Sequence, residues 1–275
     1  MEGTLCCPLP HTYVAAQLDI QATIQNLDPL TQEAARTIKP AKCLLYLYDA
    51  LRYPHPGTPT TFEAYIVGLG LRAEDPENGF TADMCVPIFP TTAHPNNRPA
   101  VLPKTRFPFS NCYHWAYVDI LLRVSSGEFP GLGGSSRLIR LAAGEQARMD
   151  RLLTKDLTTA ILAKKARRET SPRLGYDSEE DVFTCSTRKV PEDLLPIVTV
   201  SVDLSESLDE TDLPDPVEFL RQYNALLCLA KESNARREVA VGDDAVSVSR
   251  TYTESDHSIL RRDLEGKGVG RPGSE

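Results

Sequence analysis

The sequence predicts an α+β fold with a mostly antiparallel sheet of about four strands, packed by an N-terminal helical segment and two later helices. Alternating apolar and polar residues predict strands at 62–72, 82–89, 112–125 and 196–204. Helical periodicity marks 137–168 and 216–233. With 41% hydrophobic and 25% charged residues, the chain has an ordinary globular composition. We expect one domain over 1–235, with a mobile charged insertion at 169–194 and a disordered tail at 236–275.

The N-terminal part predicts helices. Residues 12–27 carry apolar side chains at roughly helical spacing, although their β-branched residues leave a strand open. Asp28 followed by Pro29 is typical of a helix start, because proline at the first helical position gives up only an amide that would lack a partner. The stretch PAKCLLYLYDALRY, 40–53, is apolar nearly all round, which predicts a buried helix. The prolines of PHPGTPT end it.

The strand predicted at 62–72 has one bulky face and one nearly flat face that carries Gly68 and Gly70. We expect a packed helix to approach these glycines closely. Pro87 places the strand at 82–89 at a sheet edge or a bulge. The proline-rich connection 90–110 reads as too polar for the core.

The stretch NCYHWAYVDILLRV, 111–124, brings a thiol and an imidazole close together. A period of two puts Cys112 and His114 on one face with Ile120, Leu122 and Val124. That face is otherwise small or aliphatic, so the pattern favours a core-facing strand. The alternative is an enzyme whose nucleophilic site lies around Cys112, His114 and Asp119, which requires an accessible thiolate and a base within reach of it.

A basic stripe follows the helix predicted at 137–168, well away from its apolar side. Gly144 is a candidate break between two helices. We expect this stripe to be the interaction surface, and nucleic-acid binding through it is a further alternative. Its members are Arg137, Arg140, Arg148, Arg151 and Lys155.

The end of this helix resembles a nuclear-import signal in its density of cations: Lys164, Lys165, Arg167 and Arg168. Ser171 precedes a proline and Ser178 precedes acids, so both are candidate phosphorylation sites. A phosphate there would add roughly −2 charge beside the cluster.

The sequence predicts no metal site and no cofactor. Its seven cysteines and five histidines lack the close pairs of a zinc site, and no glycine-rich stretch completes a phosphate-binding motif. No apolar run approaches the roughly 18 residues of a membrane span. The start lacks the features of a signal peptide, so we expect an intracellular protein, cytoplasmic or nuclear.

Charge is distributed unevenly along a chain whose net charge is −8. Residues 1–168 carry 18 Lys and Arg against 15 Asp and Glu, while residues 169–275 carry 12 against 23. Together these features favour a non-enzymatic protein-interaction or regulatory role with an unidentified protein partner. The basic helix and the phosphorylatable linker would be its contact and control elements.

Overall fold

The structure is a computed structural model that describes residues 4–131, 138–170, 190–209 and 213–239, with the backbone alone at 116–118 and 168–170. Residues 236–239 of the expected tail are helical, and the rest of that tail and most of the expected insertion lie outside the described residues. The chain divides into two compact units, Met1–Ala230 and Lys231–Glu275. The features described below belong to the first unit, except that the last helix continues beyond residue 230.

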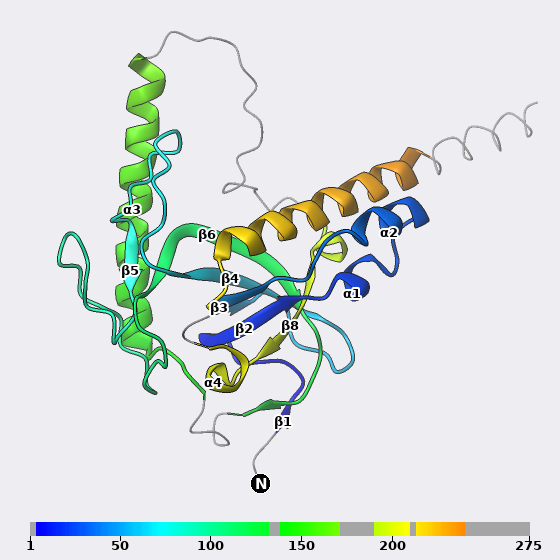
Figure 1. Ribbon diagram of the computed structural model, residues 1–275, viewed down its shortest axis with the longest axis horizontal. Coiled ribbons are helices and arrows are strands. Elements are labelled where there is room, and N and C mark those ends of the chain that lie inside the picture. Colours follow the sequence, from blue (N-terminus) through cyan, green and yellow to red (C-terminus); the bar gives the residue numbers. More distant parts are fainter. Residues whose placement is uncertain (1–3, 132–137, 171–189, 210–212, 240–275) are drawn as a thin grey trace, which may run out of the picture. The chain divides into compact units, whose positions relative to one another are not determined.

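The fold is α+β, and its centre is a closed barrel in place of the expected open sheet of four strands (Figure 1). Among the described residues, one sheet has the order β4-β3-β2-β8-β6-β5, and β4 also pairs with β6. That additional pairing closes β2, β3, β4, β6 and β8 into a ring. The strands are β2 (Thr12–Leu18), β3 (Lys42–Ala50), β4 (Thr60–Leu69), β5 (Cys85–Pro87), β6 (Cys112–Val124) and β8 (Ile197–Ser201).

The pairing is antiparallel throughout this sheet except where β6 runs parallel to β8. A separate two-stranded sheet joins β1 (Thr4–Leu5) to β7 (Phe129–Pro130). The helical elements are α1 (Ile20–Ile24), α2 (Pro29–Ala35), α3 (Ala143–Thr170), a 3-10 turn at Glu192–Leu194, α4 (Leu204–Ser207) and a helix over 216–239.

The expected buried helix over 40–53 is wrong, because most of that stretch forms β3. Cys43, Leu45 and Leu47 face the barrel interior, and Leu44 and Tyr46 face a second core outside it. A strand buried on both faces has no polar alternation, so it cannot be distinguished from a buried helix by periodicity. The helical interpretation of 12–18 fails for the same reason, since β2 is buried along nearly its whole length.

Asp28 and Pro29 begin α2 as predicted. The Asp28 side chain accepts hydrogen bonds from the amides of Leu30 and Thr31, and Pro29 occupies the first turn. This cap satisfies amide groups that have no partner inside the helix.

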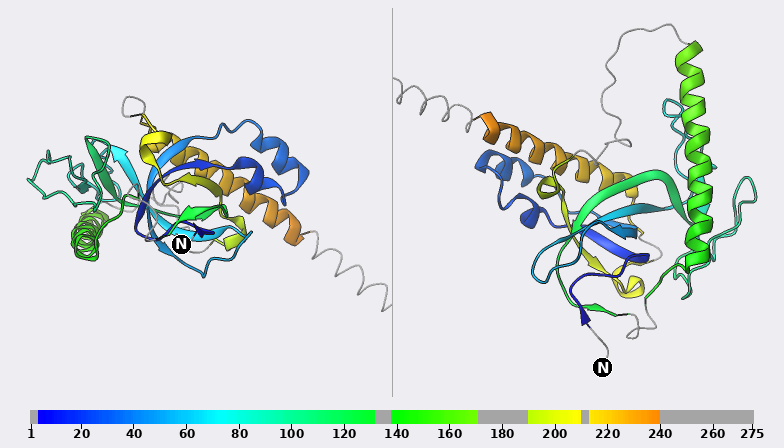
Figure 2. Two further views of the ribbon diagram at one scale, coloured as in Figure 1. Left: turned by 90° about the horizontal axis from the view of Figure 1, so that it is seen from below. Right: turned by 180° about the vertical axis from the view of Figure 1, so that it is seen from behind.

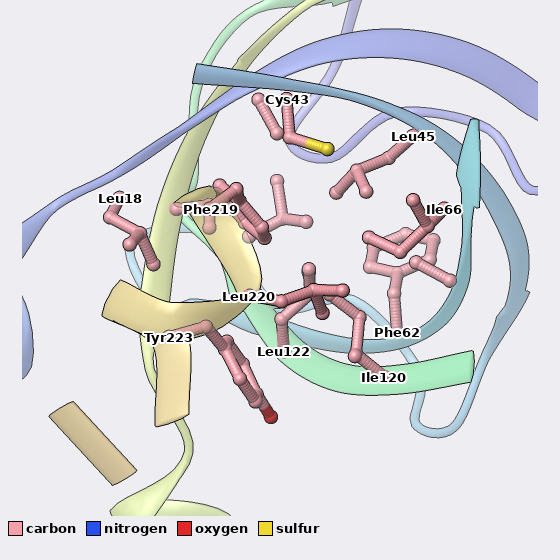
Figure 3. Close-up of a cluster of buried hydrophobic side chains, with 14 of the residues drawn as sticks. Leu18, Cys43, Leu45, Phe62, Ile66, Ile120, Leu122, Phe219, Leu220 and Tyr223 are labelled. Atoms are coloured by element: carbon pink, nitrogen blue, oxygen red, sulfur yellow. The ribbon is translucent and has the colours of Figure 1, made fainter. Parts of the chain in front are cut away.

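Two cores result from the closed sheet. The inner core fills the barrel, where Phe219, Leu220 and Tyr223 of the helix that begins at residue 216 pack against side chains of the strands (Figure 3). Tyr223 also donates a hydrogen bond to the carbonyl of Leu121 in β6. The strand residues labelled in that view are Leu18, Cys43, Leu45, Phe62, Ile66, Ile120 and Leu122.

The outer core lies between the sheet and α3, which packs against β5 and β6 (Figures 1 and 2). Met149 and Leu153 of α3 and Val86 of β5 all belong to this core. The connection 90–110 was expected to be too polar for the core, but it contributes Val101, Phe107 and Phe109, all at most 2% exposed. Three apolar side chains thus anchor this connection in the outer core, while most of its other residues are exposed or half-buried. The helix expected over 137–168 begins later than predicted: α3 begins at Ala143, residues 138–142 are not helical, and Gly144 lies in the first turn instead of dividing two helices.

The side chain that approaches the flat face of β4 belongs to Trp115 and not to a packed helix. A Cβ atom at Gly68 would lie 2.2 Å from the Trp115 ring. The indole Nε1 donates a hydrogen bond to the carbonyl of Gly70 at 3.1 Å. Gly68 therefore provides the space in which the ring lies flat against the strand.

Replacing Gly68 with alanine should lower the free energy of unfolding by about 1–3 kcal/mol, because the new methyl group overlaps a buried indole. Gly144→Ala is the matched control: no atom lies within 4 Å of its added Cβ. In a helix that change should add about 0.5–1 kcal/mol. Urea denaturation of both variants tests this, and equal effects at the two glycines would contradict it.

Candidate functional site

Cys112 and His114 are buried in the outer core. Cys112 is 1% exposed, and its thiol donates a hydrogen bond to the carbonyl of Ser110 at 3.5 Å. His114 is fully buried, and its Nε2 lies 2.8 Å from the Tyr13 hydroxyl. The ring of Tyr46 meets the imidazole edge-on at 5.2 Å. Both side chains therefore lack the access to water that the cysteine–histidine enzyme requires.

The expected common face of 112–124 is interrupted by a bulge in β6. Tyr65 of β4 pairs with Asp119, but Val67, two residues on, pairs with His114. The extra residues of β6 reverse its faces, so Cys112 and His114 point outward while Ile120, Leu122 and Val124 point into the barrel. Asp119 lies on the outer face beside Tyr65, on the far side of the bulge from the thiol and the imidazole.

Burial lowers the pKa of His114 to about 3. The imidazole is thus neutral at physiological pH, and a base of that strength is poorly suited to take a proton from a thiol. In the structure, His114 is a core side chain that is hydrogen-bonded to Tyr13 and packs among tyrosines.

A row of aromatic and titratable side chains extends from His114 to the surface, and sequence reasoning missed it. The Tyr46 hydroxyl lies 3.3 Å from Nδ1 of His11, and the Tyr48 hydroxyl donates to Oδ2 of Asp150 at 3.4 Å. Burial raises the pKa of Asp150, while the hydrogen bond from Tyr48 and the charge of His11 act to lower it. Alternating Tyr46 and Tyr48 would have signalled this row if β3 had been interpreted as a strand.

Some of the basic residues predicted on α3 make hydrogen bonds within the fold, and others are exposed to solvent. Arg137 lies outside the described residues, and Arg140 precedes α3 and donates to the carbonyl of Pro10. Arg148 donates to the carbonyl of Ala100 and pairs with Glu145 at 2.5 Å. Arg151 and Lys155 are exposed.

The import-like cluster is divided in the same way. Lys164 donates to Oδ1 of Asn78 at 2.5 Å, whereas Lys165 and Arg167 are exposed. The side chain of Arg168 and the two candidate phosphorylation sites, Ser171 and Ser178, lie outside the described residues.

The solvent-facing side of α3 combines cations with aliphatic side chains. Arg151, Lys155, Leu162 and Lys165 recur at steps of three, four or seven residues, and all are exposed. Leu162 is 62% exposed, and its neighbour Ile161 is 54% exposed. We call these five residues the α3 stripe; it extends for about 21 Å at 1.5 Å per residue.

The opposite side of α3 is fixed by a buried ion pair. The Arg98 guanidinium contacts both carboxylate oxygens of Asp156, at 2.5 and 2.8 Å, and also donates to the carbonyl of Cys85. Both side chains are at most 12% exposed. Further along, Gly79 packs so closely on the backbone of Ala160 that a Cβ atom would lie 2.4 Å from its carbonyl oxygen. The orientation of the α3 stripe toward solvent is therefore set by contacts on the other side.

The described residues contain no group of three or more His, Cys, Asp and Glu side chains placed to hold a metal ion. None of the six cysteines in the described part of the chain forms a disulfide. No helix in that part has the length and apolarity to cross a membrane. Two surface depressions of about 350 and 480 Å³ have neither histidine nor cysteine in their walls.

Comparison of the chain with protein-family models, curated proteins and solved structures finds no match. The assignment of function therefore depends on the side chains described above.

The neutral, buried state of His114 should make stability depend on pH. Between pH 6.5 and about 3 the unfolded chain binds a proton that the folded protein excludes, so the free energy of unfolding falls as pH falls. The loss reaches at most about 1.4 kcal/mol per pH unit. Urea denaturation from pH 7 to 5 should show a smaller loss in His114→Gln than in the wild type. The exposed His55→Gln is the control, and equal slopes in all three proteins would exclude a buried neutral His114.

Removing one partner of the Arg98–Asp156 pair should strongly destabilise the fold. Asp156→Ala leaves a buried guanidinium unpaired and should lower the free energy of unfolding by roughly 3–5 kcal/mol. The double variant Arg98→Met/Asp156→Leu removes both charges and should recover much of that loss. Chemical denaturation of the three proteins measures this, and a double variant no more stable than Asp156→Ala would contradict it.

Proposed function

We propose that this protein is a non-enzymatic interaction protein whose α3 stripe binds an acidic segment of a partner protein that also carries apolar side chains. The observation that carries the proposal is the pairing of exposed cations with exposed Ile161 and Leu162 on the side of α3 that the fold does not use. A helix that needs only one buried face usually places charged and polar residues on the other. Two adjacent, largely exposed aliphatic side chains depart from that pattern.

The mixture of side chains decides the class of partner. Arg151, Lys155 and Lys165 would attract either a phosphate backbone or carboxylates. Ile161 and Leu162 gain stability only when a partner removes them from water, at about 25 cal/mol per Å² of apolar surface. A partner protein with apolar side chains between its acids meets both needs, whereas a phosphate backbone meets only the first.

The α3 stripe is also firmly oriented. Arg98, Asp156 and the Gly79–Ala160 contact hold the opposite side of the helix. A surface that is already ordered loses less conformational entropy on binding.

A random peptide library displayed on phage tests the proposal on the immobilised full chain. On the wild type, enriched peptides should combine Asp or Glu with aliphatic or aromatic residues. On Lys155→Glu/Leu162→Asp that enrichment should be lost, and synthesised peptides should bind at least about tenfold more weakly, which corresponds to 1.4 kcal/mol.

The matched control is Leu30→Asp/Lys39→Glu, which makes the same two changes at exposed positions in and after α2, where Leu30 is 72% exposed. It should retain the enriched peptides. If the same peptides are enriched on both double variants, the stripe is not the binding surface. If labelled duplex DNA binds the wild type with a steep salt dependence and the peptides do not bind, nucleic-acid binding replaces this proposal.

A further inference from the structure

The row of side chains that carries the α3 stripe continues toward the N-terminal end of the helix. Lys155 and Leu162 are seven residues apart, and the same step in the other direction reaches Arg148, so the three side chains lie nearly in line along α3. The Arg148 side chain is 29% exposed and donates a hydrogen bond to the carbonyl of Ala100. The row therefore ends beside the segment 100–106.

Two large apolar side chains lie next to each other at that end, one on this segment and one on the chain that follows β5. Ile88 and Val101 form a parallel bridge, in which the Phe89 amide donates to the carbonyl of Val101 at 3.0 Å. Both residues of the bridge are fully buried, and the next residue on each chain points the opposite way. Those residues are Phe89, 44% exposed, and Leu102, 50% exposed. We call them the Phe89–Leu102 pair.

Cations follow the pair along the same surface. From 101 to 107 the chain alternates: odd-numbered residues are buried or half-buried, and even-numbered residues are exposed. Lys104 and Arg106 occupy two of the exposed positions. An extended chain places them on the same face as Leu102. Positive charge therefore borders the apolar pair.

Hydrogen bonds hold this segment against the first turn of α3 and the chain before it. The Leu102 amide donates to Oε2 of Glu145 at 2.9 Å, and the Lys104 amide donates to the carbonyl of Arg140 at 2.8 Å. Figures 1 and 2 show the chain after β5 running beside α3. A surface that is already fixed in this way loses little conformational entropy when a partner binds.

The chemistry of the Phe89–Leu102 pair matches that of the α3 stripe. Each surface combines two exposed apolar side chains with exposed cations. Glu145, the acid that contacts the segment, is itself paired with Arg148. A partner segment that alternates acids with apolar side chains fits both surfaces, because its acids meet the cations and its apolar side chains remove the others from water.

The dimensions of α3 give the length of segment that reaches both surfaces. Glu145, beside Leu102, and Lys165, at the far end of the stripe, are 20 residues apart, which is about 30 Å at 1.5 Å per residue. The stripe alone extends for about 21 Å. Because an extended chain covers about 3.3 Å per residue, the stripe needs about seven partner residues and both surfaces together need at least about nine.

We propose that the Phe89–Leu102 pair is a second docking site for the same acidic and apolar partner segment that binds the α3 stripe. The segment follows the row of α3 side chains to its N-terminal end. There its apolar side chains cover the pair, and its acids meet Lys104 and Arg106. This inference rests on the function proposed for the α3 stripe and adds to it a second contact and a minimum length of the partner segment.

Two fluorescein-labelled peptides test the length. They repeat Asp-Leu-Glu-Phe twice or three times, so that the shorter peptide spans the stripe alone and the longer one also reaches the pair. Fluorescence anisotropy with the full chain should give at least tenfold tighter binding of the longer peptide, because its second contact forms within one complex. Equal affinity of the two peptides would overturn the inference.

Substitutions at the pair show whether the gain depends on it. Phe89→Asp/Leu102→Asp should remove the tenfold gain and leave the affinity of the shorter peptide unchanged. The matched control is Leu30→Asp/Leu51→Asp, at leucines that are 72% and 48% exposed elsewhere, and it should keep the gain. Loss of the gain in both double variants, or in neither, would contradict a second docking site at the pair.

The cations beside the pair are tested by neutralisation. Lys104→Gln/Arg106→Gln should weaken binding of the longer peptide and leave the shorter peptide unaffected. Arg36→Gln/Lys39→Gln neutralises two exposed cations elsewhere and should change neither affinity. If the two double variants weaken the longer peptide equally, the attraction is a general effect of charge and the pair is not its site.

Crosslinking on the wild type does not depend on the folding of any variant. The longer peptide, carrying p-benzoylphenylalanine at one end or the other, is irradiated with the full chain and the labelled fragments are identified by mass spectrometry. One of the two peptides should label residues 87–106. Labels confined to α3 with both peptides would overturn the inference.

The outcomes separate this inference from the function on which it rests. If Lys155→Glu/Leu162→Asp weakens both peptides but the longer one has no advantage on the wild type, the second docking site fails and the α3 stripe stands. If that variant changes neither affinity, the stripe is not the binding surface and both proposals fail. If the wild type binds neither peptide, the second docking site is overturned, and the peptide-display selection alone decides the α3 stripe.

Discussion

The bulge in β6 is the constraint on which the two cores depend. β6 is the strand shared by the barrel and by β5, and it has to supply side chains to both cores. An unbroken strand keeps one set of side chains on one face along its length. The extra residues between His114 and Asp119 reverse that assignment midway. Cys112 and His114 can therefore fill the outer core while Ile120 and Leu122 fill the barrel.

The outer core in turn decides which side of α3 meets water. Met149, Leu153 and Ala160 pack on it, and Asp156 meets Arg98 in the same row. A bidentate pair in a nearly dry site tolerates little rotation of the helix, because either charge would lose its partner. The α3 stripe consequently points away from the sheet for reasons that have nothing to do with its own chemistry.

Sequence reasoning succeeded where one local pattern decides the structure. The start of α2 was readable because Asp28 and Pro29 act within one turn, and the strands at 62–72 and 112–125 were readable from alternation. It failed at β2 and β3, where burial on both faces removes alternation. The closed barrel could not be predicted either, because the second partner of β4 is set by packing between distant segments.

The same distinction applies to the candidate sites. Arg151 and Lys155 were expected on a solvated helical face, and they are exposed. Arg140 and Arg148 were grouped with them, but the carbonyls of Pro10 and Ala100 that engage them come from loops far away in sequence. Tyr48 and Tyr65 were missed because they face each other only once β3 is a strand paired with β4.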